Sequence, residues 1–385
     1  MRQPVPAPRR PVSSVEVVVV GGGPLGAATA WQLARRGTEV VLLERFGPRH
    51  RTGPGHDATR IYRPAGAIAV GTPLVDEAER LWRELEAVTG ASLLHITGGI
   101  EHGDPDRLAE LADRLASLGL AHSWLDPRDA ADRWPGMEFE GPVLYQPRHC
   151  GRLNADHAVA ALAAAATAHG ATLRHHTRVT AITVRGPARV ELDIDLPDGS
   201  SEVLRARRVV VAAGEWTAGL VDGHVRLPRL RIAQETSAYF PVSDEYLPCG
   251  ACSARWPTFV HHGRDVGYGL PVPGRGVKVS IERSEAEAGR DYPDSGRSRV
   301  LRDHVTRWLP GADPARATAS SRSYSVLPRA AVVIERNGPI VVGTGVSSAA
   351  FDAIPALGRQ IADLSIPRAQ PARPGAIGAG PTPRR

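Results

Sequence analysis

Residues 15–26 read VEVVVVGGGPLG, and this stretch decides the fold. The β-branched run at residues 15–20 is short and apolar, which predicts a buried strand of a parallel sheet. Three glycines then follow the pattern G-x-G-x-x-G, at Gly21, Gly23 and Gly26. Such a turn directly after a strand predicts a helix whose N-terminus faces a bound phosphate group.

The residues after the turn complete a strand–turn–helix–strand unit. Residues 27–37 have a helical pattern that ends at Gly37, and residues 38–44 predict a second strand that closes on Glu44. In a dinucleotide-binding unit the first glycine permits the tight turn, the second admits the pyrophosphate, and the third lets helix and strand pack closely. Glu44 would bind the ribose hydroxyls and repel a 2′-phosphate, which disfavours NADP. FAD and NAD both stay open on this unit alone.

Composition argues against several other classes of protein. The 385 residues include 47 Lys plus Arg, and the formal net charge is +6. The basic residues are scattered among acids, which argues against nucleic-acid binding. Three cysteines are too few for a disulfide framework and favour a reducing compartment, so we expect a cytoplasmic protein. Cys249 and Cys252 form a C-x-x-C pair without a second pair of ligands, so no metal site is predicted.

The two ends of the sequence differ from the rest. Residues 1–14 are rich in proline and basic residues, and residues 366–385 in proline and glycine, so we expect a disordered arm and a disordered tail. The arm lacks the apolar segment of a secretory signal. No apolar run is long enough to span a membrane.

The chain contains a single lysine, Lys278, in the stretch GRGVKVS at residues 274–280. An ammonium is a compact charge whose pKa can shift, whereas a guanidinium is a planar fork that stays charged. Two interpretations follow. Either a lysine remains by chance on an exposed strand, or the chemistry at this position needs an ammonium.

A second apolar strand, RRVVVAAGEW at residues 207–216, ends in Ala-Gly, as in flavoproteins with two dinucleotide-binding segments. With this segment the chain resembles the monomeric sarcosine oxidase branch of the D-amino-acid oxidase superfamily, whose members use FAD to oxidise secondary and cyclic amines. The resemblance covers roughly residues 15–365 and rests on several further stretches, namely GHDATRIYR (55–63), PLVDEAERLWRELE (73–86), RWPGM (133–137), YGLPVPGRGVKVS (268–280), SYSVLPRAAVVIE (323–335) and IVVGTGVSSAAFDAIPALG (340–358).

The resemblance implies an α/β plus antiparallel β architecture with two discontinuous domains. A Rossmann-type FAD-binding domain of the two-dinucleotide-binding flavoprotein class would comprise residues 15–90, 150–225 and 325–365. An α+β catalytic domain would comprise residues 91–149 and 226–324 and cover the flavin ring.

The resemblance also implies which residues serve the cofactor and the substrate. Thr59 and Arg60 would lie near the pyrimidine or phosphate side of the flavin. Lys278 matches the lysine that assists reduction of O₂ in the family's oxidases, because a fixed cation stabilises the charge that develops on oxygen. The substrate-side residues would be Tyr324, Tyr268 and Arg63. The full set expected to bind FAD is Gly21, Gly23, Pro24, Leu25, Gly26, Glu44, Arg45, Thr59, Arg60, Val179, Ala213, Gly214, Trp216, Arg322, Gly345, Val346 and Phe351.

Three positions depart from the family pattern. Arg322 stands where many relatives carry the cysteine that binds FAD covalently, so we expect noncovalent FAD. Glu282 replaces a histidine near the substrate amine, and Asp352 replaces a lysine that helps to bind the substrate carboxylate. The arginine that also binds this carboxylate is kept as Arg63. Asp352 could pair with Arg63, or Asp352 and Glu282 could hold a protonated amine; in another interpretation both acids lie on the surface.

These features together predict an FAD-dependent oxidase of a secondary or cyclic amine or imino acid. Hydride transfer to flavin N5 would give an imine, and O₂ would be reduced to H₂O₂. The altered pocket favours a specialised biosynthetic substrate and disfavours sarcosine. The alternatives are an FAD-dependent dehydrogenase that uses another acceptor and a flavin-binding protein without amine oxidation. The expected partners are a small-molecule amine and O₂, in a monomer or small homo-oligomer.

Overall fold

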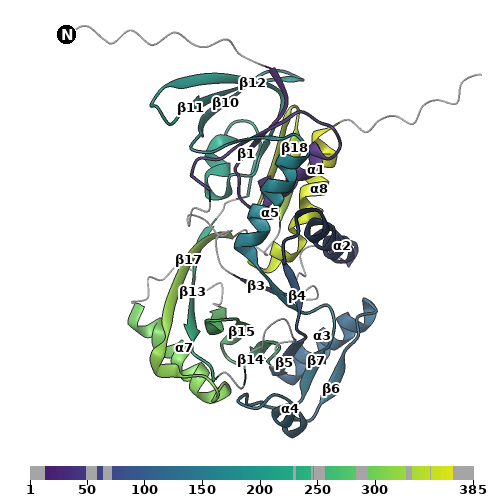
Figure 1. Cartoon of the computed structure of the whole chain (residues 1–385), viewed down its shortest axis with the longest axis vertical. Coiled ribbons are helices and arrows are strands. Elements are labelled where there is room, and N and C mark those ends of the chain that lie inside the picture. The colour runs from purple at the N-terminus through teal and green to yellow at the C-terminus, as the bar shows by residue number, and fades with distance from the viewer. Residues whose placement is uncertain are drawn as a thin grey trace, which may run out of the picture.

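The computed structural model describes residues 14–48, 59–63, 72–228, 231–243, 246, 256–282, 294–326, 332–346 and 348–366. The strands form two large sheets and one small sheet between them, and Figure 1 shows the two large sheets at opposite ends of an elongated molecule. The expected disordered arm and tail, and the pair Cys249 and Cys252, lie outside the described residues apart from Ser14 and Ile366.

The first large sheet contains the strand that precedes the glycine turn. Its path is β10-β11-β12-β1-β2-β9, with β19 paired to β12 and β18 paired to β19. Strands β19, β12, β1, β2 and β9 run parallel, as the apolar run at residues 15–20 predicts. The strands are β1 (Ser14–Val20), β2 (Val40–Leu43), β9 (Thr172–Arg174), β10 (Arg178–Gly186), β11 (Arg189–Asp195), β12 (Ser201–Val211), β18 (Val333–Asn337) and β19 (Ile340–Thr344).

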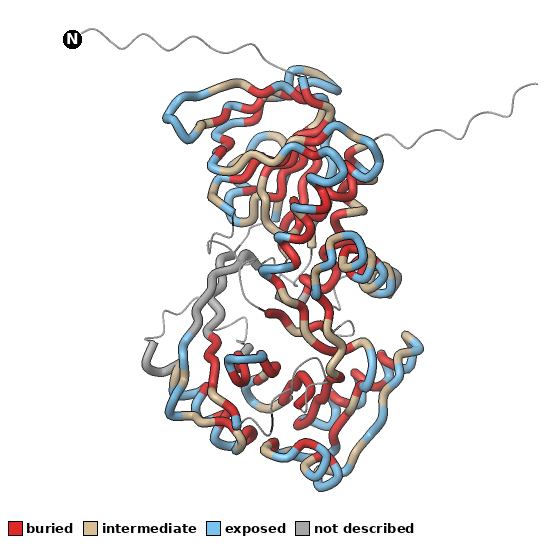
Figure 2. Tube along the Cα trace, in the orientation of Figure 1, coloured by how far each residue is buried: buried red, intermediate tan, exposed pale blue. Residues whose placement is uncertain are grey.

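Both faces of β1 are buried, because helices cover one face and strands cover the other. Val17 and Val19 lie in the core with the helices, whereas Val18 and Val20 lie in the core with β10 and β11. Figure 2 shows the resulting density of buried residues in this part of the molecule. The helices on the first face are α1 (Pro24–Ala34), α2 (Thr72–Thr89), α5 (Ala155–Ala168) and α8 (Ile354–Ser365).

The second large sheet is mostly antiparallel, in the order β17-β13-β16-β15-β14-β5-β7-β6, with one parallel pair, β14 and β5. Its strands are β5 (Gly99–Gly103), β6 (Ser123–Leu125), β7 (Val143–Gln146), β13 (Arg231–Phe240), β14 (Thr258–His262), β15 (Val266–Val272), β16 (Gly276–Glu282) and β17 (Thr318–Val326). The helices of this part are α3 (Pro105–Ser117), α4 (Pro127–Arg133) and α7 (Asp294–Trp308). The short helices of the chain are η2 (Gly214–Trp216), α6 (Thr217–Leu220), η3 (Pro314–Arg316) and η5 (Ser348–Ala353).

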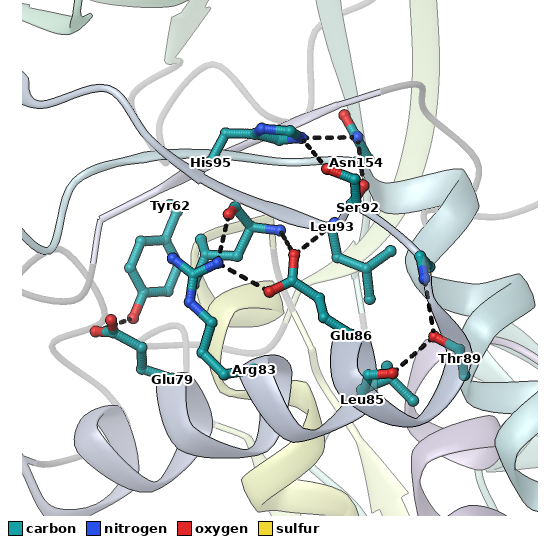
Figure 3. A network of polar contacts seen from close by, with 12 residues as sticks. Tyr62, Glu79, Arg83, Leu85, Glu86, Thr89, Ser92, Leu93, His95 and Asn154 are labelled. Carbon is teal, nitrogen blue, oxygen red and sulfur yellow. Dashed lines mark hydrogen bonds and ion pairs between the residues drawn. The ribbon is translucent and has the colours of Figure 1, made fainter. Parts of the chain in front are cut away.

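The small sheet lies between the large ones and consists of β3 (Arg60–Tyr62), β8 (Gly151–Leu153) and β4 (Leu94–Ile96). Helix α2 holds this sheet in place through the polar contacts drawn in Figure 3. Glu86 Oε1 accepts hydrogen bonds from the amides of Leu93 and Leu94, at 2.7 and 2.9 Å, and Arg83 donates to the Leu94 carbonyl at 2.8 Å. Tyr62 on β3 donates to Glu79 on α2 at 3.2 Å. These bonds fix the strand that ends beside Arg63.

The two faces of the second sheet have different environments, and β16 shows this by alternation. Val277 and Val279 lie in the core that includes α7, Phe240 and Phe259. Lys278 pairs with Tyr239 and Leu270, which belong to a separate apolar cluster that contacts Ile61 of the small sheet. Residues opposite one another on neighbouring strands share a face. Lys278 therefore lies on the face that looks toward the small sheet and the first domain.

Candidate active site

The glycine turn after β1 is built for close backbone contacts. A Cβ atom on Gly26 would lie 1.8 Å from the carbonyl oxygen of Gly21, so α1 can begin at this distance from the strand only with glycine. Gly21 has φ 103°, and a Cβ there would lie 2.4 Å from the Ala212 carbonyl oxygen after β12. A Cβ on Gly23 would meet nothing within 4 Å. The turn thus leaves open space at Gly23, where the sequence pattern expects the pyrophosphate.

Glu44 supports this turn from the end of β2. Its Oε2 accepts a hydrogen bond from the Gly22 amide at 2.6 Å, and its Oε1 accepts one from the Phe46 amide at 2.8 Å. The carboxylate is buried beside the turn. Arg45 lies over the rings of Phe46 and Trp216, at 5.3 Å from each centroid, so two expected cofactor residues meet at this edge.

The carboxyl ends of β1, β12 and β19 meet at one edge of the first sheet because the three strands run parallel. Ala213 and Gly214 follow β12, and Gly345, with φ 80°, and Val346 follow β19. The hydroxyls of Thr217 and Thr344 are buried at this edge without a hydrogen-bond partner in the described part of the chain. Ligands of open α/β sheets bind at this end of the strands. The open turn and the two unsatisfied hydroxyls fit a dinucleotide such as FAD.

Other expected cofactor residues occupy distinct places. Thr59 is buried and donates its hydroxyl to the Leu153 carbonyl at 3.1 Å. Arg60 lies over the ring of Phe351, at 5.7 Å from the centroid. Val179, in β10, is buried in the core on the face of the first sheet opposite the helices, together with Val20 and Leu43. The remaining two, Pro24 and Leu25, form the first turn of α1.

Arg63, directly after β3, carries the expected carboxylate-binding guanidinium. Its Nη1 donates to Glu101 Oε1 at 3.1 Å across the gap between the small and the second large sheet. Glu101 is 1% exposed, and its other oxygen lies 2.6 Å from His262 Nε2. Burial by itself raises the pKa of Glu101, but the charge of Arg63 and the contact with His262 hold this pKa below the ordinary value. The Arg63–Glu101 pair is therefore ionised at neutral pH.

Asp352, in η5, contacts the main chain of the same residue. Its Oδ2 accepts a hydrogen bond from the main-chain amide of Arg63 at 2.7 Å, and its carbonyl accepts one from Trp82 Nε1 at 2.8 Å. Asp352 is only 6% exposed, so the interpretation of a surface acid is wrong for this residue. Burial raises its pKa to about 7, although the amide hydrogen bond and the charges of Arg63 and Arg60 act in the opposite direction.

Lys278 lies on the same sheet face as Glu101. Lys278 pairs with Leu270, and Tyr268, two residues away on the same strand, shares the face of Leu270. Tyr268 pairs with Val260, which in turn pairs with Glu101. Lys278 is 4% exposed, which rules out a lysine left on an exposed strand. Tyr268 lies two residues from Leu270, on this same face.

Tyr324, Arg322 and Glu282 are placed by register alone, since their side chains lie outside the described part of the structure. Tyr324 pairs with Ala233, Arg322 with Glu235 and Glu282 with Val266. By strand alternation all three positions share the face of Lys278.

The sequence interpretation did not include Glu101, His262 or Thr344. Glu101 carried a weak signal, as an acid inside the strand-length stretch GIEHG. His262 gave no signal, because nothing in the sequence places β14 beside β5. Thr344 precedes Gly345 at the end of an apolar strand. Because ligands of parallel sheets bind at the carboxyl ends of the strands, this position could have been predicted as a ligand contact.

Comparison with known proteins agrees with this geometry. The family model described as FAD dependent oxidoreductase (DAO) matches residues 16–364. Monomeric sarcosine oxidase from Bacillus sp. (strain NS-129) is 26% identical over 370 residues, with 91% of this chain and 92% of that protein covered. Peroxisomal sarcosine oxidase from Homo sapiens is 27% identical over 374 residues, with coverage of 91% and 92%. The structure of NikD, an unusual amino acid oxidase essential for nikkomycin biosynthesis, superposes with a TM-score of 0.75 at 25% identity and covers 93% of this chain and 95% of that one.

The chain belongs to the FAD dependent oxidoreductase (DAO) family. It is an FAD-dependent amine oxidoreductase, and the expected fold class is confirmed, with a Rossmann-type FAD-binding sheet and a mainly antiparallel second sheet. The exact domain boundaries stay a prediction. Within the described ranges, no helix combines the length and apolar character needed to cross a membrane.

Proposed function

We propose that the protein is an oxidase of a secondary or cyclic amine or imino acid, with O₂ as the electron acceptor. The observation that carries the proposal is Lys278, the only lysine of the chain, buried on the sheet face shared with Tyr268 and the Arg63–Glu101 pair. Burying an ammonium costs hydration free energy, so the retention of the only lysine at a buried position favours a chemical role. Stabilising negative charge on oxygen is such a role.

The chemistry that FAD supplies when bound is acceptance of a hydride from the carbon beside the substrate nitrogen, which leaves an imine, and transfer of the two electrons to O₂ as H₂O₂. The turn formed by Gly21, Gly23 and Gly26 would admit its pyrophosphate at Gly23, and Glu44 would bind its ribose. Lys278 would hold a fixed positive charge where oxygen is reduced. Tyr268 and Arg63 would orient the amine, together with Tyr324 from β17.

The substrate class follows from Glu101 and Asp352, the two acids that contact Arg63. Sarcosine carries a free carboxylate, and Asp352 replaces the lysine that the resemblance expects for this group. We infer a specialised amine of a biosynthetic pathway; NikD, similar over 93% of this chain, is an amino acid oxidase of that kind. We also infer a cytoplasmic enzyme that holds FAD noncovalently, since Arg322 stands at the cysteine position.

The test begins with acid precipitation of the yellow holoprotein, which should release the flavin to the supernatant. The holoprotein is then mixed anaerobically with a panel of secondary and cyclic amines. At least one amine should bleach the visible flavin absorbance, and admission of air should restore the colour and form H₂O₂. Bleaching without H₂O₂ in air would show an acceptor other than O₂. Rapid, complete bleaching by sarcosine would show that the inference about the two acids is wrong.

A further inference from the structure

Glu101 is enclosed by polar partners from two neighbouring strands and from the residue that follows β3. Arg63 contacts its Oε1 at 3.1 Å, Gln146 Nε2 donates to the same oxygen at 3.4 Å, and His262 lies 2.6 Å from its Oε2. The exposed fraction of its side chain is 2%, whereas that of Arg63 is 28%. A substrate can therefore reach Arg63 but not the carboxylate of Glu101.

The charge around Arg63 is then balanced before any substrate binds. Glu101 cancels the guanidinium charge at 3.1 Å, and Asp352 adds a second carboxyl group that contacts the main-chain amide of the same arginine at 2.7 Å. A free carboxylate brought to Arg63 would meet an ion pair and a neighbouring acid. In a buried site of low effective dielectric, the ionised Glu101 weakens the attraction between Arg63 and an incoming anion substantially.

We propose that Glu101 is a specificity-determining positioning residue, which holds Arg63 in a buried ion pair so that the pocket selects amines without a free carboxylate next to the nitrogen. The proposal rests on the proposed amine oxidase function and narrows its substrate class to secondary or cyclic amines, so that imino acids with a free carboxylate are excluded. The ring or chain beside the nitrogen would carry a neutral group, such as an amide or an ester, or no polar group.

The experiment uses two cyclopentane compounds that carry no amine nitrogen and cannot be oxidised by an amine oxidase, cyclopentanecarboxylate and cyclopentanecarboxamide. They are nearly identical in shape and differ in charge. Their dissociation constants are measured on holoenzyme by calorimetry or by perturbation of the flavin spectrum. In the wild type we expect the amide to bind roughly tenfold more tightly or better. In Glu101→Gln the ratio should shift toward the carboxylate by roughly 10- to 100-fold, because one negative charge beside Arg63 is removed.

The matched control is Glu79→Gln. Glu79 is another acid near β3, less buried than Glu101, and it pairs with Tyr62 and His149, at 3.2 and 3.1 Å. This change should leave the amide-to-carboxylate ratio unchanged, whereas a general loosening of the small sheet would weaken both ligands in both variants. An unchanged ratio in Glu101→Gln overturns the proposal.

If Glu101→Gln does not fold, the two dissociation constants of the wild type still test the proposal. Tighter binding of the carboxylate than of the amide would overturn it. Neither ligand is oxidised, so these results are independent of turnover. Failure of every amine to reduce the flavin would reject the proposed function and leave the binding order interpretable.

Discussion

The two faces of the second sheet each carry buried histidines, but in different electrostatic environments. Glu101 and His262 meet at 2.6 Å on the face toward the small sheet, in a cluster with Arg63. Their sequence neighbours, His102 and His261, lie on the other face, with ring centroids 4.8 Å apart. His304 from α7 packs against His261, at 5.5 Å between centroids. One step along a strand therefore separates an ionised cluster from a group of imidazoles.

The far-face histidines are held in the neutral form. Burial lowers the pKa of His102 to about 3 and that of His304 to about 4, and the other histidines of the group act in the same direction. The pKa of His261 is also lowered, chiefly by burial, although Glu140 opposes this. His102 Nδ1 accepts a hydrogen bond from the Glu140 amide at 3.2 Å, which requires that nitrogen to be unprotonated. Burial alone thus gives neutral imidazoles, whereas burial with an opposite charge gives an ion pair.

The largest expected effect tests the charged face. Lys278→Met should fold and bind FAD, because the new side chain has similar length. Reduction by the true substrate should change little, and reoxidation by O₂ should slow by roughly 10²- to 10³-fold, since one fixed cation is lost. Lys278→Arg should also be slow, because a guanidinium keeps the charge without the geometry. Stopped-flow mixing of reduced enzyme with O₂ measures both rates.

Val279→Ala is the matched control on the opposite face of the same strand. It removes buried apolar contacts with the α7 core and should lower the free energy of unfolding by roughly 1–3 kcal/mol without slowing reoxidation. Wild-type reoxidation in both lysine variants would contradict the assigned role of Lys278 and favour an acceptor other than O₂.

The second-largest expected effect is a loss of stability at low pH, caused by the neutral histidines on the other face. A histidine whose pKa is lower in the folded state binds more protons when unfolded, so stability falls as the pH drops from about 6.5 toward 4. His102 and His304 should each cost about 2 kcal/mol of stability between pH 7 and pH 5. His304→Gln should lose its own share of this dependence, seen as a smaller drop in melting temperature between the two pH values.

His157→Gln provides the comparison, because this histidine is exposed on α5. It should retain the wild-type difference in melting temperature between pH 7 and pH 5. An equal difference in His304→Gln and wild type would mean that the buried histidines do not set the acid sensitivity.

The smallest effect has the opposite sign and lies at Asp352. An acid with a raised pKa stabilises the fold below its unfolded pKa, and this stability is lost as the pH rises through the folded value of about 7. Between pH 6 and pH 8 the free energy of unfolding of the wild type should fall by about 1 kcal/mol, and this decrease should be absent in Asp352→Asn. Melting temperatures of the two holoproteins at both pH values test this, and parallel curves would refute a raised pKa.

The local pattern of the chain predicted much of the first sheet. The run at residues 15–20, the turn at Gly21 and the strand that closes on Glu44 correspond to β1, the start of α1 and β2. The turn could be recognised because its constraints act between near neighbours, as the 1.8 Å contact at Gly26 shows. The lone Lys278 could be selected from composition alone, and its burial on the inner face agrees with that choice.

The partners of the site were decided by the tertiary structure. Arg63 meets Glu101 across 38 residues and Asp352 across 289, and these contacts depend on how three sheets stack. The face on which Glu101 or His102 lies depends on strand register, and a shift of one residue would exchange them. The sequence by itself determined the dinucleotide turn, because local sterics suffice for it. Only the tertiary structure, which brings Arg63 after β3 to Glu101 on β5, determined which acid holds Arg63, because long-range register and burial fix the charge of each group.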